Sequence, residues 1–259
     1  MPANLENQIA IVTGGADGIG CAISQLFCKQ GARVCVADVN AEMGEAFVHE
    51  LNANGYKAIF VQTDISSSDS VQKMVSATAS KLGNPTILVN NAGIIWENPD
   101  LLDTSEEDWR RSFGVNVDGM WNCSKAVIPY MKEARSGSIV NVGSVHGFKI
   151  VRGHFPYAVT KHAVTGLTKN LAVEFGEFNI RVNALCPGMI ETPNAFKWWA
   201  SMDDPEGCRK ALGELHPLKR NGTLDEIAYP ALFLAGPESS FMTGQNLIVD
   251  GGRTSVYHD

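Results

Sequence analysis

The sequence predicts a single α/β domain, in which a doubly wound, seven-stranded parallel sheet is flanked by helices on both faces. Seven short runs rich in β-branched residues alternate along the chain with longer segments of helical periodicity. The runs are almost continuously apolar, which is typical of strands covered on both faces. Alternating strands and helices require right-handed crossovers, which produce a parallel sheet. No internal repeat or linker divides the chain, so residues 1–259 are expected to form one domain.

The expected elements follow this alternation in chain order. Strands are expected at 9–13, 33–38, 58–62, 86–90, 138–142, 180–185 and 246–250. Helices are expected near 19–30, 41–54, 68–82, 106–133, 157–176 and 224–235. The Ser-Ser-Ser-Asp run at 66–69 and the Thr-Ser-Glu-Glu run at 104–107 are typical capping sequences, and they support the starts of two of these helices.

One segment, between Pro187 and Leu224, interrupts the alternation. It has prolines and glycines near its edges, a Phe-Lys-Trp-Trp cluster at 196–199 and an Asp-Asp-Pro-Glu run at 203–206. An insertion of this kind before the last strand is typical of a lid over a binding site. We therefore expect a substrate-binding lid at about 188–223.

Composition narrows the classes of function. The formal net charge is −7 and no run of lysine or arginine stands out, so neither nucleic acid nor a membrane surface is an expected partner. No stretch approaches a spanning helix, and the first residues lack a signal-peptide pattern, so we expect a cytoplasmic protein. The six cysteines form no Cys-x-x-Cys pair and no histidine stands at zinc-finger spacing, so no metal site is expected.

A glycine-rich loop follows the first expected strand. Residues 13–20 read Thr-Gly-Gly-Ala-Asp-Gly-Ile-Gly, with the spacing Gly-x-x-x-Gly-x-Gly, and open the first helix. Backbone amides and a helix N-terminus at such a turn can hold a pyrophosphate. Asp38 ends the second strand, where a carboxylate should accept hydrogen bonds from ribose hydroxyls and repel a 2′-phosphate. The loop also carries Asp17 and no basic residue, so we expect NAD rather than NADP.

Tyr157 and Lys161 are four residues apart on an expected helix, and therefore lie on one face. A free phenol has a pKa of about 10, and a positive charge within ~4–6 Å favours the phenolate. The pair could therefore exchange a proton, with Ser144 upstream at the end of an expected strand. Taken alone, this spacing is also common on ordinary half-buried helices.

Five motifs occur together in one order: the glycine loop, Asn-Asn-Ala-Gly at 90–93, Ser144, Tyr157-x-x-x-Lys161 and Pro-Gly at 187–188. In this order they make the chain resemble the short-chain dehydrogenases/reductases over almost its full length, which implies a Rossmann fold. By this resemblance, Tyr157 exchanges a proton with the substrate oxygen and Ser144 holds that oxygen. Lys161 binds the nicotinamide ribose and lowers the tyrosine pKa, and Asn116 supports a proton relay through water.

The resemblance also implies the residues that bind NAD. Asp64 should contact adenine, Asn90 should lie beside the ribose and brace the central strand, and Ile190 with Thr192 should meet the carboxamide. The full expected set is Gly14, Asp17, Gly18, Ile19, Gly20, Asp38, Val39, Asp64, Ile65, Asn90, Ala92, Gly93, Tyr157, Lys161, Pro187, Gly188, Ile190 and Thr192.

Substrate choice should depend on residues 94–98, 145–156 and the lid. The segment between Ser144 and Tyr157 is rich in polar side chains, namely His146, Lys149, Arg152 and His154. Either all of them serve an oxygen-rich substrate, or Lys149 and Arg152 face solvent and His146 alone lines the pocket. The aromatic residues Trp96, Phe196, Trp198 and Trp199 could pack on a sugar ring, or could equally serve a core or an interface. The expected substrate-binding set is Ser144, His146, His154, Tyr157 and Trp198.

These observations favour an NAD(H)-dependent oxidoreductase that interconverts a secondary alcohol and a ketone, or a lactol and a lactone, in a sugar, sugar acid or polyol. A 3-oxoacyl carrier-protein reductase or other carbonyl reductase is the alternative enzyme. A non-catalytic nicotinamide-binding sensor or scaffold is the alternative of another class. The resemblance further implies a homotetramer that pairs apolar faces at 120–131 and 163–175. The short tail at 253–259 has two possible roles: it frays in solvent, or it reaches the active site of a neighbouring subunit.

Overall fold

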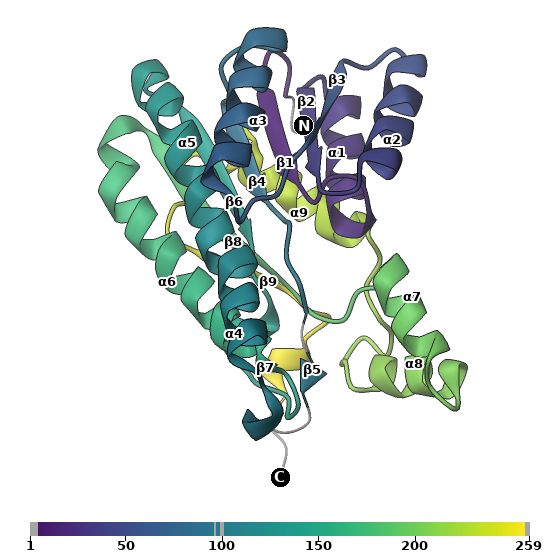
Figure 1. Cartoon of the computed structure of the whole chain (residues 1–259). Helices are drawn as coiled ribbons and strands as arrows, with labels where there is room; N and C mark the ends of the chain where they lie inside the picture. The colour runs from purple at the N-terminus through teal and green to yellow at the C-terminus, as the bar shows by residue number, and fades with distance from the viewer. Residues whose placement is uncertain (1–4, 96, 99–100, 257–259) are drawn as a thin grey trace.

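The computed structural model describes residues 5–95, 97–98 and 101–256. Within these ranges the chain forms one Rossmann-like α/β domain around a seven-stranded parallel sheet of order β3-β2-β1-β4-β6-β8-β9 (Figure 1). The strands are β1 (Ile9–Thr13), β2 (Arg33–Asp38), β3 (Ala58–Gln62), β4 (Ile87–Asn90), β6 (Gly137–Val142), β8 (Ile180–Pro187) and β9 (Asn246–Val249). All seven expected strands are present; β1, β2 and β3 have the expected ends, and one end of each of the other four differs by one or two residues. A separate antiparallel pair joins β5 (Glu97–Asn98) to β7 (Phe155–Pro156).

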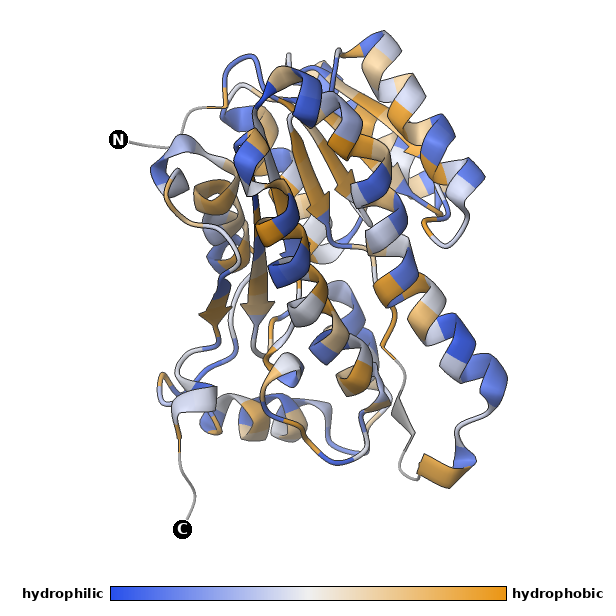
Figure 2. Ribbon diagram, turned by 90° about the vertical axis from the view of Figure 1, so that its left-hand side faces the viewer, coloured by the Kyte–Doolittle hydropathy of each residue, from blue (hydrophilic) through white to orange (hydrophobic). Residues whose placement is uncertain are grey.

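Helices cover both faces of the sheet, as expected. They are α1 (Gly18–Lys29), α2 (Ala41–Ala53), α3 (Ser68–Lys81), α4 (Glu106–Phe113), α5 (Gly119–Ala134), α6 (Tyr157–Phe175), α7 (Pro193–Ala200), α8 (Pro205–Glu214) and α9 (Asp225–Ala235). Helices α1, α2 and α9 pack on one face, and α3, α5 and α6 pack on the other (Figure 1). The strands between them are strongly hydrophobic, whereas the helices carry hydrophilic residues on their outer turns (Figure 2). In the described ranges, no helix has the length and apolar character needed to cross a membrane.

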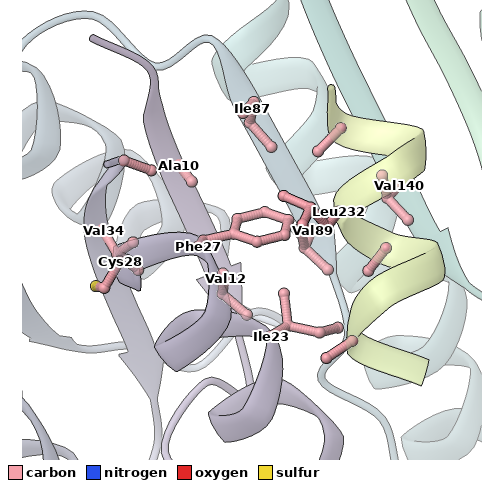
Figure 3. Packing of buried hydrophobic residues seen from close by; sticks show 14 of the residues in the cluster. Ala10, Val12, Ile23, Phe27, Cys28, Val34, Ile87, Val89, Val140 and Leu232 are labelled. Carbon is pink, nitrogen blue, oxygen red and sulfur yellow. The ribbon is translucent and has the colours of Figure 1, made fainter. Parts of the chain in front are cut away.

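Alternate residues of each strand supply the two cores. Ala10 and Val12 of β1 belong to the cluster under α1 and α9, while Ile9 and Ile11 belong to the cluster under α3 and α5. This division follows from the two-residue period of a strand. Phe27 of α1 is fully buried in the first cluster and lies among strand side chains and α9 (Figure 3). Burying one such ring contributes roughly 1.5–3 kcal/mol, so the clusters hold the carboxyl ends of the strands in fixed positions.

The expected helix at 106–133 is wrong as one continuous element. A π-helical turn, η2 (Gly114–Asp118), separates α4 from α5. A π-turn inserts one extra residue per turn and is often found at functional sites. Here it carries Asn116, which is fully buried and faces the loop after β4. The local sequence has no signal for this turn, because the residue pattern on either side is compatible with an ordinary α-helix.

The segment expected to be a lid contains two helices that the sequence analysis left unassigned, α7 and α8. Thr192 caps the first of them, since its Oγ1 accepts a hydrogen bond from the Ala195 nitrogen at 3.0 Å. Asp204 caps the second through the Gly207 nitrogen at 2.9 Å. The two ends of the segment meet at a parallel bridge between Ile190 and Gly222. The helices therefore form an excursion that leaves and rejoins the sheet at one place (Figure 1).

Candidate active site

The expected site residues gather at the carboxyl ends of the central strands. Strand β1 has β2 on one side and β4 on the other, because the chain adds β2 and β3 outward on one side and then crosses back from β3 to β4 on the other side. In doubly wound sheets this reversal opens a crevice outside the strand ends, where ligands bind. The glycine loop, Asp38, Asn90 and Ser144 all follow strands at this edge.

The glycine loop joins β1 to the N-terminus of α1 in a conformation that side chains would block. Gly14 and Gly18 have φ angles of +59° and +52°, which favour glycine. A Cβ at Gly20 would lie 2.0 Å from the Gly14 carbonyl oxygen. Asp17 caps the helix by accepting a hydrogen bond from the Gly18 nitrogen at 2.7 Å, and Ile19 packs half-buried against the core. The loop therefore offers a close backbone approach at a helix N-terminus, the arrangement that suits a pyrophosphate.

Thr13 and Asn91 fasten this loop to β4. The Thr13 hydroxyl accepts hydrogen bonds from the nitrogens of Asn91 (3.0 Å) and Ala92 (3.1 Å), and donates to the Val89 oxygen (3.3 Å). In return, Asn91 Nδ2 donates to the carbonyl oxygens of Thr13 and Gly14, both at 3.0 Å. Sequence reasoning missed both roles. Thr13 and Asn91 stand at the ends of two apolar runs, but the sequence alone does not show that these two strands are neighbours in the sheet.

Asp38 stands at the end of β2 beside the glycine loop, as expected. Its Oδ2 accepts a hydrogen bond from the Ala16 nitrogen at 3.2 Å and its Oδ1 accepts one from the Asn40 nitrogen at 3.0 Å. Val39 follows with 63% of its surface exposed. The carboxylate thus supports the loop and remains only partly buried, so its oxygens can also accept from a ribose.

The residues after β3 differ in their surroundings. Asp64 is exposed, and its Oδ1 accepts hydrogen bonds from the nitrogen and hydroxyl of Ser66 at 2.9 and 2.6 Å. Ile65 is buried, and a Cβ at Gly119 would lie 2.6 Å from its Cδ1. The Ile65 side chain therefore packs under α5, so only its backbone is placed to meet a nucleotide.

Asn90 braces the centre of the sheet, in agreement with the prediction. Its Nδ2 donates to Asn141 Oδ1 (2.9 Å), Ser124 Oγ (3.2 Å) and the Met120 oxygen (3.4 Å). The side chain is fully buried and points toward α5 rather than into the crevice. Its proximity to a ribose stays a prediction for the backbone.

The residues after β8 begin the excursion toward α7. Pro187 ends the strand, and a Cβ at Gly188 would lie 2.9 Å from the backbone of Asp250, so no side chain fits there. Ile190 is 6% exposed, while Thr192 is half-buried. A Cβ at Gly18 would approach Thr192 at 3.8 Å, so the start of the excursion lies across the crevice from α1.

Ser144, Tyr157 and Lys161 come together, as the sequence predicts. Tyr157 opens α6 and Lys161 stands one turn later, with its Nζ 5.5 Å from the centre of the tyrosine ring. Lys161 as a whole is 4% exposed, and its ammonium donates a hydrogen bond to the Val142 oxygen at 2.8 Å. Ser144 ends the connection from β6, and its Oγ accepts a hydrogen bond from the His146 nitrogen at 3.1 Å.

In this structure the pKa of Tyr157 is raised rather than lowered, and the lowering effect expected of Lys161 stays a prediction. Burial raises the pKa of Tyr157 from 10.0 to about 12; a hydrogen bond with Ser144 lowers it in part and Cys186 raises it further. Burial also lowers the pKa of Lys161 from 10.5 to about 8. Sequence spacing shows that the two groups are close, but it does not show that both are desolvated. Desolvation disfavours the charged form of each group and has the larger effect.

Asn116 links the π-turn to this cluster. Its Oδ1 accepts from the Ile94 nitrogen and its Nδ2 donates to the Ile94 oxygen, both at 2.8 Å, and Nδ2 also donates to Thr160 Oγ1 at 3.1 Å. A Cβ at Gly93 would lie 3.2 Å from Asn116 Oδ1 and 3.8 Å from Lys161 Nζ. Asn116 and Lys161 therefore border the same glycine, and the proton relay through water stays a prediction.

Cys186 is a member of the cluster that the sequence did not single out. It is fully buried in β8, and a Cβ at Gly143 would lie 2.8 Å from its Sγ. Burial raises its pKa to about 11, against the lowering effects of a backbone hydrogen bond with Ser144 and of the Lys161 charge. The thiol is therefore uncharged at neutral pH and lies near Tyr157.

The substrate side of the crevice matches only part of the expected set. His146 and His154 stack with ring centres 4.5 Å apart, and His146 meets the Tyr157 ring edge-on at 5.7 Å. Lys149 and Arg152 are exposed, in agreement with the alternative that they face solvent.

The expected aromatic residues are divided. Trp199 is 2% exposed and packs edge-on against Phe196 at 5.2 Å, so it serves the core of the α7–α8 excursion. Trp198 is half-buried on α7, and its contact with a substrate stays a prediction. Trp96 lies outside the described residues.

Comparison with known proteins places this geometry among nucleotide-dependent oxidoreductases. The family model described as "Enoyl-(Acyl carrier protein) reductase" matches residues 14–254. The chain is 38% identical over 253 residues to Oxidoreductase UcpA of Salmonella typhimurium, covering 96% of this chain and 95% of that protein. It is 40% identical over 248 residues to 3-oxoacyl-[acyl-carrier-protein] reductase FabG of Thermotoga maritima, covering 96% and 98%. Among solved structures, a gluconate 5-dehydrogenase from Burkholderia cenocepacia in complex with NADP and tartrate is similar, with a TM-score of 0.91, 31% identity and 98% of each chain covered.

Proposed function

The chain belongs to the short-chain dehydrogenase/reductase family, and from this premise we propose that it is an NAD(H)-dependent enzyme that interconverts a secondary alcohol and a ketone, or a lactol and a lactone. As a member of this family it is an oxidoreductase that acts on alcohol or carbonyl groups and binds a nicotinamide cofactor. The observation that carries the proposal is the cluster of Ser144, Tyr157 and Lys161 across the crevice edge from the glycine loop.

The residues of the crevice fit a dinucleotide. The glycine loop leaves no room for side chains beside the N-terminus of α1, and Asp38 presents a carboxylate at the end of the neighbouring strand. A bound nicotinamide would supply the acceptor or donor of the hydride. Asp38 and Asp17 support NAD, because both place negative charge where a 2′-phosphate would approach. The complex of the gluconate 5-dehydrogenase with NADP shows that a similar fold accepts the other cofactor, so this preference depends on these side chains.

Tyr157 would act as the general acid or base, and its environment suggests which form is held ready. A pKa of about 12 keeps the phenol protonated, so it can donate a proton to a carbonyl oxygen held by Ser144. In the oxidative direction the phenolate must form, and the ammonium of Lys161 is the positive group beside the ring. Asn116 would support the water that exchanges this proton with solvent.

For the substrate we propose a sugar, sugar acid or polyol. The imidazoles beside Tyr157 support an oxygen-rich molecule, and the similar gluconate 5-dehydrogenase supports a sugar acid. The second candidate is a 3-oxoacyl carrier-protein reductase, which the 40% identity to FabG favours. A net charge of −7 opposes docking of an acidic carrier protein. The sensor or scaffold alternative has less support, because Ser144, Tyr157 and Lys161 are all present, with Ser144 and Lys161 both next to Tyr157.

The proposal also includes the substrate-binding lid and the oligomeric state. Residues of about 188–223 would form the lid, and a homotetramer would pair the outer faces of α5 and α6, where Trp121 is 47% exposed and Val173 is 86% exposed. The end of the tail, 257–259, lies outside the described residues.

The deciding experiment is a substrate panel with NAD and with NADP, followed by the absorbance of the reduced nicotinamide. The panel contains sugars, sugar acids, polyols, steroids and acyl thioesters, each offered as alcohol or as carbonyl compound. We expect turnover of sugars, sugar acids or polyols with NAD. Turnover confined to acyl thioesters or steroids would contradict the proposed substrate class, and turnover with NADP alone would contradict the proposed cofactor.

A further inference from the structure

His146 lies beside Tyr157, the proposed proton-transfer group, and next to Ser144. Its backbone nitrogen donates to Ser144 Oγ at 3.1 Å, and its ring meets the ring of Tyr157 edge-on at 5.7 Å with an interplanar angle of 70°. On its other side it stacks on His154 at 4.5 Å and 22°. The ring is therefore held from two sides, and its position is coupled to both Ser144 and Tyr157.

The two ring nitrogens of His146 have different surroundings. Within the described part of the chain, Nδ1 is fully buried without a hydrogen-bond partner, while Nε2 is the nitrogen that retains contact with solvent. A buried N–H without an acceptor costs about 1–3 kcal/mol, and an unused lone pair is tolerated more easily. The tautomer with the proton on Nε2 is thus favoured, and the ring presents a donor at its accessible edge.

The ring is also uncharged at neutral pH. Burial lowers the pKa of His146 to about 4, and the neighbouring imidazoles of His154 and His162 lower it further. An imidazolium would favour a carboxylate, whereas a neutral N–H favours a hydroxyl or carbonyl oxygen. Lys149 and Arg152, the cations of the same segment, are exposed.

We propose that His146, backed by His154, is a specificity-determining residue that donates a hydrogen bond to a second substrate oxygen, on the carbon next to the reacting carbon. The proposal rests on the proposed function and sharpens it. Because the rings of His146 and Tyr157 are in contact, their two donors can reach oxygens on neighbouring carbons, each through a hydrogen bond of about 2.8 Å. The favoured substrates are then vicinal diols, α-hydroxyketones and their relatives, with an uncharged oxygen at the second position.

The test compares matched probes on the NAD-bound enzyme: trans-cyclohexane-1,2-diol, cyclohexanol and 2-hydroxycyclohexanecarboxylate. We expect wild-type kcat/KM to be at least about tenfold higher for the diol than for cyclohexanol, with no such gain for the carboxylate. His146→Phe keeps a ring that can stack on His154 but removes the donor, so the diol should lose this advantage while cyclohexanol changes less than about twofold. His146→Gln retains a donor and should recover part of the advantage. His49→Phe, exposed on α2, is the control for loss of a histidine elsewhere.

The outcomes separate this inference from the proposed function. Equal loss on diol and cyclohexanol in His146→Phe, with thermal unfolding unchanged, would overturn the inference and leave the dehydrogenase intact. So would a wild type that turns over the sugar panel but prefers cyclohexanol or the carboxylate to the diol. Absence of turnover on every compound, in both cofactors, would overturn the proposed function and the inference with it.

Discussion

On the nucleotide side of the crevice, Thr13 and Asn91 make their hydrogen bonds to backbone groups of the chain itself, whereas on the substrate side His146 keeps a buried nitrogen without a described partner. The nucleotide side is also built from residues close together in sequence at each strand end. The substrate side is built from η3 (Val145–Gly147), the residues before α6, and the α7–α8 excursion. The loop on the nucleotide side is held by hydrogen bonds within the chain, although Asn90 Oδ1 is buried there without a described partner, whereas the imidazoles on the substrate side are held mainly by ring stacking. This difference suggests that the cofactor is recognised by shape and backbone, and the substrate by individual side chains.

The largest expected effect lies at the junction of the two sides. Tyr157→Phe removes the proton donor, and we expect kcat to fall by about 10²–10⁴-fold while nucleotide affinity and thermal unfolding stay close to wild type. Steady-state kinetics with the best panel substrate, together with a nucleotide titration, check this. Tyr229→Phe, at a tyrosine that is 60% exposed on α9, is the matched control and should leave kcat unchanged. A Tyr157→Phe enzyme of wild-type activity would favour the sensor alternative.

The next effect tests whether the nucleotide side is fixed by internal bonds. Thr13→Val keeps the side-chain volume but leaves the Ala92 nitrogen without its acceptor and the Asn91 nitrogen with the Val89 oxygen alone, so the free energy of unfolding should fall by about 1–3 kcal/mol. Denaturant unfolding of the nucleotide-free protein measures it. Thr13→Ser retains the hydroxyl and should recover part of the loss. If Thr13→Val and the wild type are equally stable, the hydrogen bonds between Thr13 and the residues after β4 do not stabilise the glycine loop.

The charge at Asp38 tests whether side chains add to backbone recognition on the nucleotide side. Asp38→Asn removes the charge but retains an oxygen that can accept from Ala16 or Asn40. We expect the ratio of kcat/KM for NAD over NADP to fall at least about tenfold, because repulsion of the 2′-phosphate is lost. Glu133→Gln, which changes the net charge equally at an exposed position near the end of α5, serves as control. An unchanged ratio in Asp38→Asn would mean that another group selects the cofactor.

The smallest effect concerns the buried ammonium of Lys161. Its pKa falls from 10.5 to about 8 on folding, so between pH 8 and 10.5 the unfolded chain binds more protons and stability rises with pH. Lys161→Met lacks this titrating group, so its stability does not contain this dependence on pH. Relative to the variant, the wild-type free energy of unfolding should gain about 1–2 kcal/mol between pH 7.5 and 9.5, measured without nucleotide. Lys73→Met, at an exposed position on α3, is the control. A constant difference between wild type and Lys161→Met across this range would show that the lysine is well solvated.

Much of the fold was predictable because its signals are local. Continuous apolar runs mark the strands, and the side-chain caps at Ser67 and Ser105 lie where the capping sequences predict them. The helices α7 and α8 were also within reach, since Thr192-Pro193 and Asp204-Pro205 are cap and first-position pairs, although the sequence analysis predicts only a lid for this segment.

What could not be predicted depends on contacts between distant segments. The π-turn at Asn116 exists because its amide pairs with the backbone of Ile94, and no residue near 116 indicates this. The raised pKa of Tyr157 follows from burial among several strands and helices, which spacing on one helix does not reveal. The stacking of His146 on His154 likewise depends on how the chain folds back before α6.

The single bridge between Ile190 and Gly222 has an evolutionary consequence. Two backbone hydrogen bonds, from Gly222 to Met189 and from Glu191 to Gly222, both at 2.9 Å, close the base of the α7–α8 excursion. The segment between them also bonds to the turn after β9, through the Leu218 nitrogen and the Gly251 oxygen at 3.3 Å, but it contributes no strand to the β8–β9 pairing. If this segment is the proposed lid, we expect substrate range to diversify through changes in it, while the glycine loop and the Tyr157 cluster keep their places in the sheet.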